Sequence, residues 1–241
     1  MKIAIIGYGR MGREIESAAL EKGHEIVAFI DDVSDWEKQA ELLQTADVAI
    51  EFSIPSSAPD NILRCFEKKL PVVSGTTAWL DRIDEIKNIC IQKNQAFFYA
   101  PNYSIGVNIF FELNHRLAQL MKDFPEYEIS ITEAHHAQKA DAPSGTAIRL
   151  ADDIIKEIEH KKGWTGQEPD KSEIPITSIR EGNITGSHSV TYEFEFDKIE
   201  IHHDAKNRKG FAVGAVMAAE WIIGKKGCFG MSDLLNPDRK Q

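Results

Sequence analysis

Residues 2–12 read K-I-A-I-I-G-Y-G-R-M-G, a short apolar run followed at once by a glycine-rich loop. The run is β-rich and almost wholly apolar, as in a central parallel strand that is buried on both faces. Helical spacing follows over residues 13–22 and ends at Gly23, and residues 25–30 form a second apolar run. This stretch predicts a β-α-β unit at the start of the chain.

The alternation of strand and helix patterns continues to about residue 100. Further strands are predicted at residues 48–52, 71–74 and 96–99, and helices at residues 59–69 and 80–92. Strands that alternate with helices in this way are typical of a doubly wound parallel sheet of the Rossmann type.

From residue 105 onward the pattern changes. A helix is predicted at 105–121, strands at 128–134, 174–180 and 187–196, a helix at 145–161 and a polar loop at 162–171. The alternation of polar and apolar residues suggests an antiparallel sheet with one wet face. An Ala-rich helix over 211–223 is expected to pack back on the first sheet. We therefore expect an α/β domain of residues 1–104 and 208–241, and a second, α+β domain of residues 105–207.

Composition narrows the class of protein. The 241 residues are 42% hydrophobic, which is enough for one or two cores. The 28 basic and 38 acidic residues give a net charge of -10, which disfavours nucleic acid and anionic membranes as partners. The three cysteines form no C-x-x-C pair, and no apolar stretch is long enough to span a bilayer. We expect a cytoplasmic protein.

The loop of residues 7–12 has the pattern G-x-G-x-x-G between a predicted strand and a predicted helix. Such a loop can be only a turn, but here Asp31 and Asp32 follow about 20 residues later, where a ribose-binding carboxylate is expected. Asp31 is the first choice because it directly ends an apolar run, and Asp32 can instead begin the next turn. A carboxylate there favours NAD over NADP, whereas Arg10 is close enough to neutralise an added phosphate.

Residues 133–146, E-A-H-H-A-Q-K-A-D-A-P-S-G-T, form the densest polar stretch of the chain. His135, His136 and Lys139 offer a proton donor near neutral pH and a fixed positive charge. The backbone amides of Gly145 and Thr146 lie at the start of a predicted helix, where unpaired N–H groups can bind a carboxylate. The alternatives are solvated histidines, a zinc site or a serine hydrolase. No familiar ligand spacing or nucleophile elbow supports the last two, so we predict no metal.

The chain resembles the dihydrodipicolinate reductases, also called 4-hydroxy-tetrahydrodipicolinate reductases. Residues 133–147 match the signature E-A-H-H-x-x-K-x-D-A-P-S-G-T-A of this family throughout. Further matching motifs lie at residues 9–13, 52–55, 75–77, 102–108 and 180–182, at Gly186 and His188, and at Arg208, Phe211, Ala212, Gly214, Ala215 and Val216. Many members have a loop one residue longer at the first glycines, and often a basic residue or histidine where Ala137 and Gln138 stand here.

The resemblance implies an NAD(P)H-dependent oxidoreductase that reduces 4-hydroxy-tetrahydrodipicolinate (dihydrodipicolinate) to tetrahydrodipicolinate in diaminopimelate and lysine biosynthesis. It implies that the first domain binds NADH or NADPH, with NADH slightly favoured, and that the second binds the dicarboxylate substrate and builds a homotetramer, the domains closing over the ligands. The alternatives are another Rossmann amino-acid or imine dehydrogenase, and a non-catalytic dinucleotide sensor.

The resemblance also implies individual roles. His135 is the general acid, Lys139 is a proton donor and carboxylate partner, and His136, Gly145 and Thr146 bind substrate. The implied cofactor contacts are Gly7, Tyr8, Gly9, Arg10, Met11, Gly12, Asp31, Gly75, Thr76, Thr77, Ala100, Pro101, Asn102, Tyr103, Arg208 and Phe211.

Overall fold

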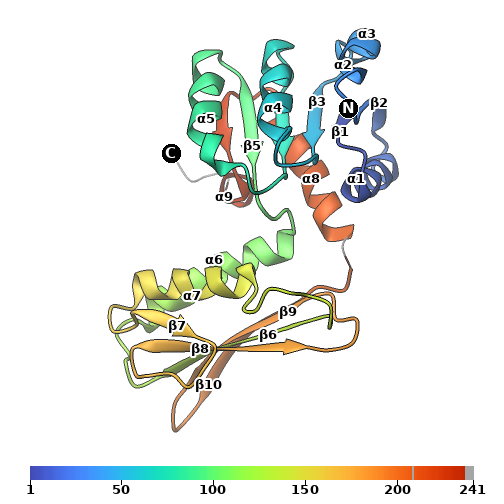
Figure 1. Ribbon diagram of the computed structural model, residues 1–241. Helices are drawn as coiled ribbons and strands as arrows, with labels where there is room; N and C mark the ends of the chain where they lie inside the picture. Colours follow the sequence, from blue (N-terminus) through green and yellow to red (C-terminus); the bar gives the residue numbers. More distant parts are fainter. Residues whose placement is uncertain (208, 237–241) are drawn as a thin grey trace. The chain divides into compact units, whose positions relative to one another are not determined.

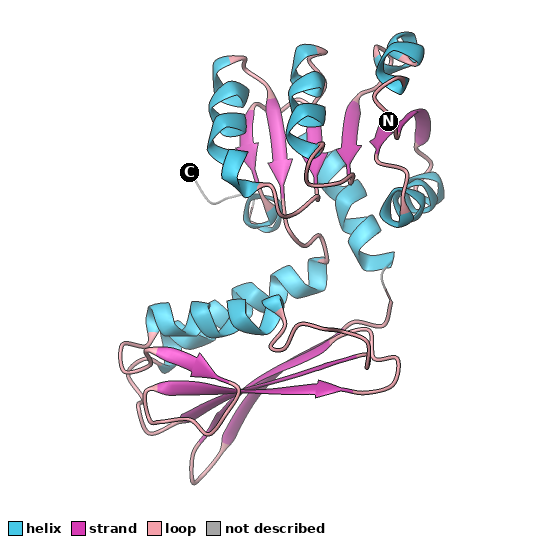
Figure 2. Cartoon of the chain, in the orientation of Figure 1, coloured by secondary structure: helices cyan, strands magenta, loops and turns pink. Residues whose placement is uncertain are grey.

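The computed structural model describes residues 1–207 and 209–236 and divides the chain into two compact units. Unit 1 comprises Met1–Ile105 and Lys209–Gln241, and unit 2 comprises Gly106–Arg208. Each unit has a sheet of its own, shown by arrows in Figures 1 and 2.

Unit 1 contains a parallel sheet in the order β11-β5-β4-β3-β1-β2. Its strands are β1 (Lys2–Ile6), β2 (Glu25–Ile30), β3 (Val48–Glu51), β4 (Val72–Ser74), β5 (Ala96–Tyr99) and β11 (Gly227–Phe229). The strand order changes direction at β1, where the chain goes first to β2 on one side and then to β3 on the other. The sheet confirms the predicted doubly wound fold. Strand β11, which has only three residues, was not predicted from the sequence.

Helices cover both faces of this sheet (Figure 1). Side chains of α1 (Arg10–Glu21) and α8 (Lys209–Ile222) share one core with the sheet, and those of α4 (Ala58–Glu67) and α5 (Ile83–Gln92) share the other. The short elements α2 (Asp35–Lys38), α3 (Ala40–Leu43), η1 (Leu80–Arg82) and α9 (Met231–Leu235) complete the unit.

The return of the chain to unit 1 depends on a close approach at Gly214. A Cβ atom on Gly214 would lie 1.8 Å from the carbonyl oxygen of Tyr103, so only glycine lets α8 come this near. The apolar residues of α8 are buried against β1, β3 and β5. The predicted packing of the last long helix on the first sheet is confirmed.

Unit 2 contains a sheet in the order β10-β9-β6-β8-β7. Its strands are β6 (Glu128–His135), β7 (Gly163–Thr165), β8 (Glu173–Arg180), β9 (Ser187–Glu193) and β10 (Lys198–Asp204). The prediction of an antiparallel sheet is wrong for half of it, because β6 pairs with β8, and β8 with β7, in parallel. The reason is α7 (Gly145–Glu157), which follows β6 and provides the crossover that parallel pairing requires.

One face of this sheet is covered by α6 (Ile105–Met121) and α7, which run beside each other (Figure 1). Their apolar residues form one core with Ile129, Ile131, Val190 and Tyr192 of the sheet. Predicted bounds erred where the pattern was weak. The polar loop at 162–171 contains the edge strand β7, and the charged strand β10 was not foreseen.

The longest helix among the described residues, α6, has 17 residues, and two of its buried residues, Asn108 and Asn114, are polar. Across residues 1–207 and 209–236, no helix combines the length and apolarity needed to cross a membrane. The three cysteines are free thiols.

Candidate active site

The glycine loop follows β1, and its three glycines serve two different purposes. A Cβ on Gly7 would lie 2.3 Å from the carbonyl oxygen of Phe52, and one on Gly12 would lie 2.3 Å from that of Gly7. Gly7 also has a φ of +87°, a region that favours glycine. A Cβ on Gly9, in contrast, would meet nothing within 4 Å. The first and third glycines serve packing, and the second faces open space that a ligand can use.

The start of α1 is open to an anion. Gly9 occupies the N-cap without a side-chain hydrogen bond, and the first turn contains no acidic residue. The first amides of a helix have no partner within it, and its positive end favours phosphate. Together with the space beside Gly9, this arrangement fits the pyrophosphate of a dinucleotide.

A cavity of about 220 Å³ lies next to this loop in unit 1. Two acidic residues and no Lys or Arg are among its lining residues, Gly7, Gly9, Ile30, Asp31, Asp32, Val33, Trp36, Phe52, Ser53, Ile54, Ser57 and Asn61. Asp31 Oδ1 accepts a hydrogen bond from the Tyr8 amide at 2.8 Å, which fixes it against the glycine loop. Asp32 Oδ1 accepts from the Ser34 amide at 2.8 Å, and this bond lowers the Asp32 pKa. Asp32 thus holds a turn, as its alternative reading predicted.

The other predicted cofactor residues of unit 1 differ in how far they are exposed. Gly75 lies against the Phe52 ring, and a Cβ there would come within 2.2 Å of it. Thr76 is buried, whereas Thr77 and Pro101 are exposed. Tyr103 is buried and donates its hydroxyl hydrogen to the Ser74 carbonyl at 2.7 Å, so a ligand could reach only its backbone.

The remaining predicted residues belong to the glycine loop, to the segment after β5, or to the sequence at and just before the start of α8. Tyr8 donates its hydroxyl hydrogen to Glu16, and Arg10 is exposed at the start of α1. Met11 packs at the edge of the core, and Ala100 is buried. Asn102, Phe211 and Arg208 complete the set: the first two are partly exposed, and Arg208 lies outside the described residues.

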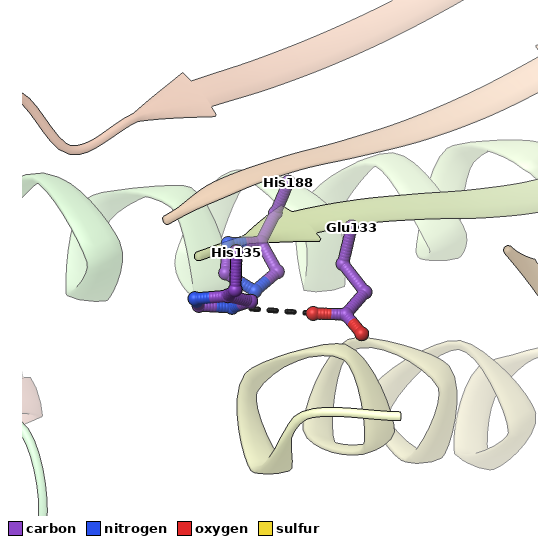
Figure 3. A group of neighbouring side chains, drawn as sticks. All are labelled: Glu133, His135 and His188. Carbon is purple, nitrogen blue, oxygen red and sulfur yellow. Dashed lines mark ion pairs between the residues drawn. The ribbon is translucent and has the colours of Figure 1, made fainter. Parts of the chain in front are cut away.

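The cluster of residues 133–146 belongs to unit 2, where β6 ends and α7 begins. Glu133 and His135 project from the same face of β6, and His188 of β9 is the direct register partner of Glu133. Figure 3 shows the three side chains converging. Glu133 Oε2 and His135 Nε2 are 3.2 Å apart, and neither atom has a hydrogen-bond partner within the part of the chain that the structure describes. The His135 and His188 rings meet edge to face with centroids 5.2 Å apart.

Glu133 is wholly buried and is held by an arginine. Arg180 Nη2 lies 2.6 Å from Glu133 Oε1, and the Ser144 amide approaches the same oxygen at 3.4 Å. Burial acts to raise the Glu133 pKa, but hydrogen bonds from Arg180, Ser178 and Ser144 outweigh it and the pKa is lowered. Glu133 is therefore a carboxylate at neutral pH.

The two histidines are kept neutral by their surroundings. Burial is the largest cause of the lowered His135 pKa; the Glu133 charge opposes it, and the Lys139 and Arg180 charges add to it. Burial, followed by the His135 charge, lowers the His188 pKa to about 4. His188 Nε2 lies 3.2 Å from Ser144 Oγ, which also caps α7 by accepting from the Ala147 amide. His188 is thus a neutral support, and His135 is the group that can change its protonation state.

The remaining predicted substrate residues lie around this centre. Lys139 Nζ is bound by both carboxylate oxygens of Asp141, at 2.6 and 2.7 Å. His136 Nδ1 is buried and has no hydrogen-bond partner. Gly145 is exposed at the first position of α7, where a Cβ would meet nothing within 4 Å, and Thr146 follows it. These groups offer a cation, ring nitrogens and helix amides within one segment.

A metal is the alternative use of Glu133, His135 and His188, whose ligand atoms all lie within 4.8 Å of one another. Arg180 argues against it, because a guanidinium already occupies Glu133 Oε1 and would repel a cation. The sequence analysis gave no role to Glu133, Arg180 or His188. The signal for Glu133 was present, since residues two apart on a strand share a face; the other two come from strands β8 and β9, whose pairing the sequence did not fix.

Two family models cover nearly the whole chain. The model described as dihydrodipicolinate reductase, N-terminus, matches residues 1–103, and that described as dihydrodipicolinate reductase, C-terminus, matches residues 106–235. The chain belongs to the dihydrodipicolinate reductase family. This membership confirms the predicted family, its NAD(P)H-dependent oxidoreductase class and its reaction in lysine biosynthesis, ahead of the alternatives of another dehydrogenase or a sensor.

Relatives match most or nearly all of the chain. The 4-hydroxy-tetrahydrodipicolinate reductase of Christiangramia forsetii is 50% identical over 242 residues, covering 98% of this chain and 98% of that protein. That of Methanosarcina mazei is 40% identical over 211 residues, covering 86% and 79%. A solved dihydrodipicolinate reductase from Paenisporosarcina sp. TG-14, with dipicolinate bound, has a TM-score of 0.76 at 24% identity and covers 95% of this chain and 97% of that one. The last likeness confirms the predicted fold class.

The steric contacts of the loop predict how its glycines respond to alanine. Gly12→Ala and Gly7→Ala each force backbone apart, and we expect the free energy of unfolding to fall by about 1 to 3 kcal/mol in each, measured by urea denaturation. Gly9→Ala is the matched control and should unfold as the unaltered protein does, because its methyl group meets no atom. Equal destabilisation by all three variants would contradict this account of the loop.

Proposed function

We propose that the chain reduces a cyclic dicarboxylate, 4-hydroxy-tetrahydrodipicolinate, with His135 as the general acid. The observation that carries the proposal is the pairing of His135 with the buried Glu133 carboxylate, beside Lys139 and the start of α7. An acid, a cation and free helix amides in one segment are what a dicarboxylate that must gain a proton requires. The solved Paenisporosarcina enzyme has dipicolinate bound, and we extend a ligand of that class to this chain.

The substrate carboxylates are proposed to bind Lys139, His136 and the amides of Gly145 and Thr146. Among residues 1–207 and 209–236 the buried His136 Nδ1 has no hydrogen-bond partner, which supports a ligand there. Lys139 is already turned toward a carboxylate, that of Asp141, at 2.6 Å. A substrate carboxylate would take the place of Asp141 on the ammonium group.

Bound NADH or NADPH supplies the hydride for this reduction. Unit 1 is proposed to hold it with Gly7 to Gly12 around the pyrophosphate and Asp31 on the adenosine ribose. The two acidic residues of the cavity, and the absence of Lys and Arg from its described lining, support NADH as the preferred form, because a 2′-phosphate would meet like charge. Thr77, Pro101, Asn102 and Phe211 remain proposed contacts of the same cofactor.

His135 is proposed to deliver its proton to the substrate, with Lys139 as a second donor. In the free protein burial lowers the His135 pKa and leaves the ring neutral. A bound dianion adds negative charge near the ring, and negative charge favours the imidazolium form. Substrate binding would thereby load the acid, while Glu133 holds the ring in place.

The two units divide the work in this proposal. Unit 1 binds the dinucleotide, and unit 2 binds the substrate and forms a homotetramer. The sheet face opposite α6 and α7 supports assembly, because small side chains such as Ser130, Thr132, Ser189 and Thr191 occupy it at neighbouring register positions. We propose the cytoplasm as the compartment, since the reaction draws on the reduced nicotinamide pool.

The direct test couples the product of the preceding synthase reaction to oxidation of NADH and of NADPH in parallel, followed by the loss of absorbance of the reduced cofactor. We expect turnover with both and a higher kcat/KM with NADH. If neither NADH nor NADPH supports turnover, the proposed function is refuted.

Replacement of the acid and of the cation should affect chemistry and leave cofactor binding in place. His135→Gln and Lys139→Met are each expected to lower kcat by about 10² or more, the usual size of acid catalysis. The affinity for NADH, measured by fluorescence titration, should stay near that of the unaltered protein. Normal turnover in both variants would remove these residues from the mechanism.

The Glu133 charge is predicted to control the pH profile. It raises the His135 pKa against the effect of burial, so Glu133→Gln should lower that pKa further. An acid must be protonated to act, and kcat/KM falls as pH rises through its pKa. The alkaline fall of kcat/KM should therefore move to lower pH in Glu133→Gln. A profile that only decreases in height, with its midpoint unmoved, would contradict the electrostatic role.

The ribose carboxylate is tested by two neighbouring acids. Asp31→Ala removes an ionised hydrogen-bond partner, so NADH affinity should fall by about 10-fold or more, and by more than NADPH affinity. Asp32→Ala is the matched control and should leave NADH affinity little changed, because its carboxylate caps the turn at Ser34; any gain should fall on NADPH, because one negative charge leaves the cavity. Fluorescence titration with each cofactor measures the effect. Equal loss of NADH and NADPH affinity in Asp31→Ala would assign the ribose to another residue.

A further inference from the structure

Glu51 is a buried carboxylate for which the proposed reaction has no use. It is the last residue of β3, and its side chain has no exposed surface. Oε1 accepts hydrogen bonds from the Ser53 amide at 2.9 Å, from Ser53 Oγ at 2.5 Å and from Thr76 Oγ1 at 2.8 Å. Oε2 accepts from Ser74 Oγ at 2.6 Å. Four donors on two oxygens match the acceptor-only form of the group.

No ion pair joins Glu51 to a cation among residues 1–207 and 209–236. Burial of a carboxylate without a counter-ion is costly, and only good hydrogen bonds offset it. Its charge reaches nearby groups, since after burial it is the next cause of the raised pKa of Tyr99. A fold that needed only to join two loops could do so with neutral side chains.

The partners of Glu51 are Ser53 in the loop after β3, Ser74 at the end of β4 and Thr76 in the loop after β4, at the end of the sheet where the glycine loop also lies. Ser53 lines the cavity beside Asp31. Thr76 lies in a segment proposed to contact the cofactor, and its Oγ1 also accepts from the Ser53 amide at 2.9 Å. The buried Glu51 therefore holds together the loops after β3 and β4, which form part of the proposed dinucleotide site.

The direction of these bonds decides what Ser53 can offer a ligand. A serine hydroxyl has one hydrogen and two lone pairs. Of the two acceptors of this hydrogen, Glu51 Oε1 at 2.5 Å is much closer than the Ile54 carbonyl oxygen at 3.5 Å, and Asn61 Nδ2 donates to one lone pair at 3.2 Å. The remaining lone pair can only accept. The cavity thus presents acceptors, at Ser53 and at Asp31, which suit ribose hydroxyls and oppose a further phosphate.

We propose that Glu51 is a positioning residue for cofactor specificity: by taking the hydroxyl hydrogen of Ser53 it keeps Ser53 an acceptor for a ribose hydroxyl of the dinucleotide and disfavours a 2′-phosphate. The inference rests on the proposed dinucleotide site of unit 1. It adds a second source of NADH preference, independent of the Asp31 charge.

The test compares Glu51→Met with Glu51→Gln by fluorescence titration of NADH and NADPH on the full-length protein. Met has a similar length but only a weak acceptor, its thioether sulfur, so the Ser53 hydrogen can turn toward the cavity. We expect the ratio of NADH to NADPH affinity to shift toward NADPH by about 10-fold. Gln keeps a carbonyl oxygen where Oε1 lies and can donate to Ser74, so it should retain the ratio of the unaltered protein.

A matched control separates this effect from loss of stability. Ile86→Val removes a methyl group from the same unit, at a buried site of α5 that does not line the cavity. It should lower the melting temperature without changing the affinity ratio. If Glu51→Met does not fold, Ser53→Ala replaces it, because that change removes the acceptor directly and should also shift the ratio toward NADPH.

Three results would overturn the inference. They are an unchanged ratio in Glu51→Met, an unchanged ratio in Ser53→Ala, and an equal shift in Glu51→Gln and Glu51→Met, which would make the charge rather than the acceptor decisive. Failure of the unaltered protein to bind either dinucleotide would instead refute the proposed function of unit 1. Each variant is compared with the unaltered protein by its ratio of NADH to NADPH affinity, so the outcome does not depend on which cofactor the unaltered protein prefers.

Discussion

A carboxylate withdrawn from water must be met by donors from the protein, and this constraint shapes both sites of the chain. Glu51 ends β3 in unit 1, and Glu133 lies near the end of β6 in unit 2; neither has exposed side-chain surface. Each draws together segments that are distant in sequence, because a missing donor would leave a buried charge unsatisfied at a cost of several kcal/mol. The loops after neighbouring strands are therefore tied to one another through a side chain rather than only through the backbone.

The two carboxylates are satisfied in different ways, and the difference fits different uses. All the partners of Glu51 are neutral donors, and both of its oxygens are engaged, so it is suited to hold a fixed arrangement. Glu133 is paired through Oε1 with Arg180, while Oε2 lies 3.2 Å from His135 Nε2. The second arrangement leaves a lone pair directed at a group that can take up a proton. Glu51 holds the residues around it in a fixed arrangement, whereas Glu133 lies next to His135, a group whose charge can change.

The first sheet was predictable because both of its faces are buried, and such strands are written in the sequence as short apolar runs between turns. The second sheet was not, because alternation identifies a strand without stating its neighbours. The parallel pairing of β6 with β8 requires α7 to act as a crossover. This depends on tertiary packing, which the pattern within a single strand does not encode. For the same reason His135 could be singled out within one dense segment, whereas its supports Arg180 and His188 reach it across β8 and β9. Glu51 gave no signal, since two of its donors, Ser74 and Thr76, lie 23 and 25 residues further along the chain.

The ion pair between Lys139 and Asp141 has a consequence for how anions enter unit 2. Asp141 is an internal substitute for an incoming carboxylate, two residues along the same loop and in contact through both of its oxygens. In the proposed mode of substrate binding, entry of a dicarboxylate is an exchange of one anion for another, and the direction of the ammonium group is set beforehand by Asp141. The displaced aspartate would return when the ligand leaves, and would then compete with the product for the same ammonium group.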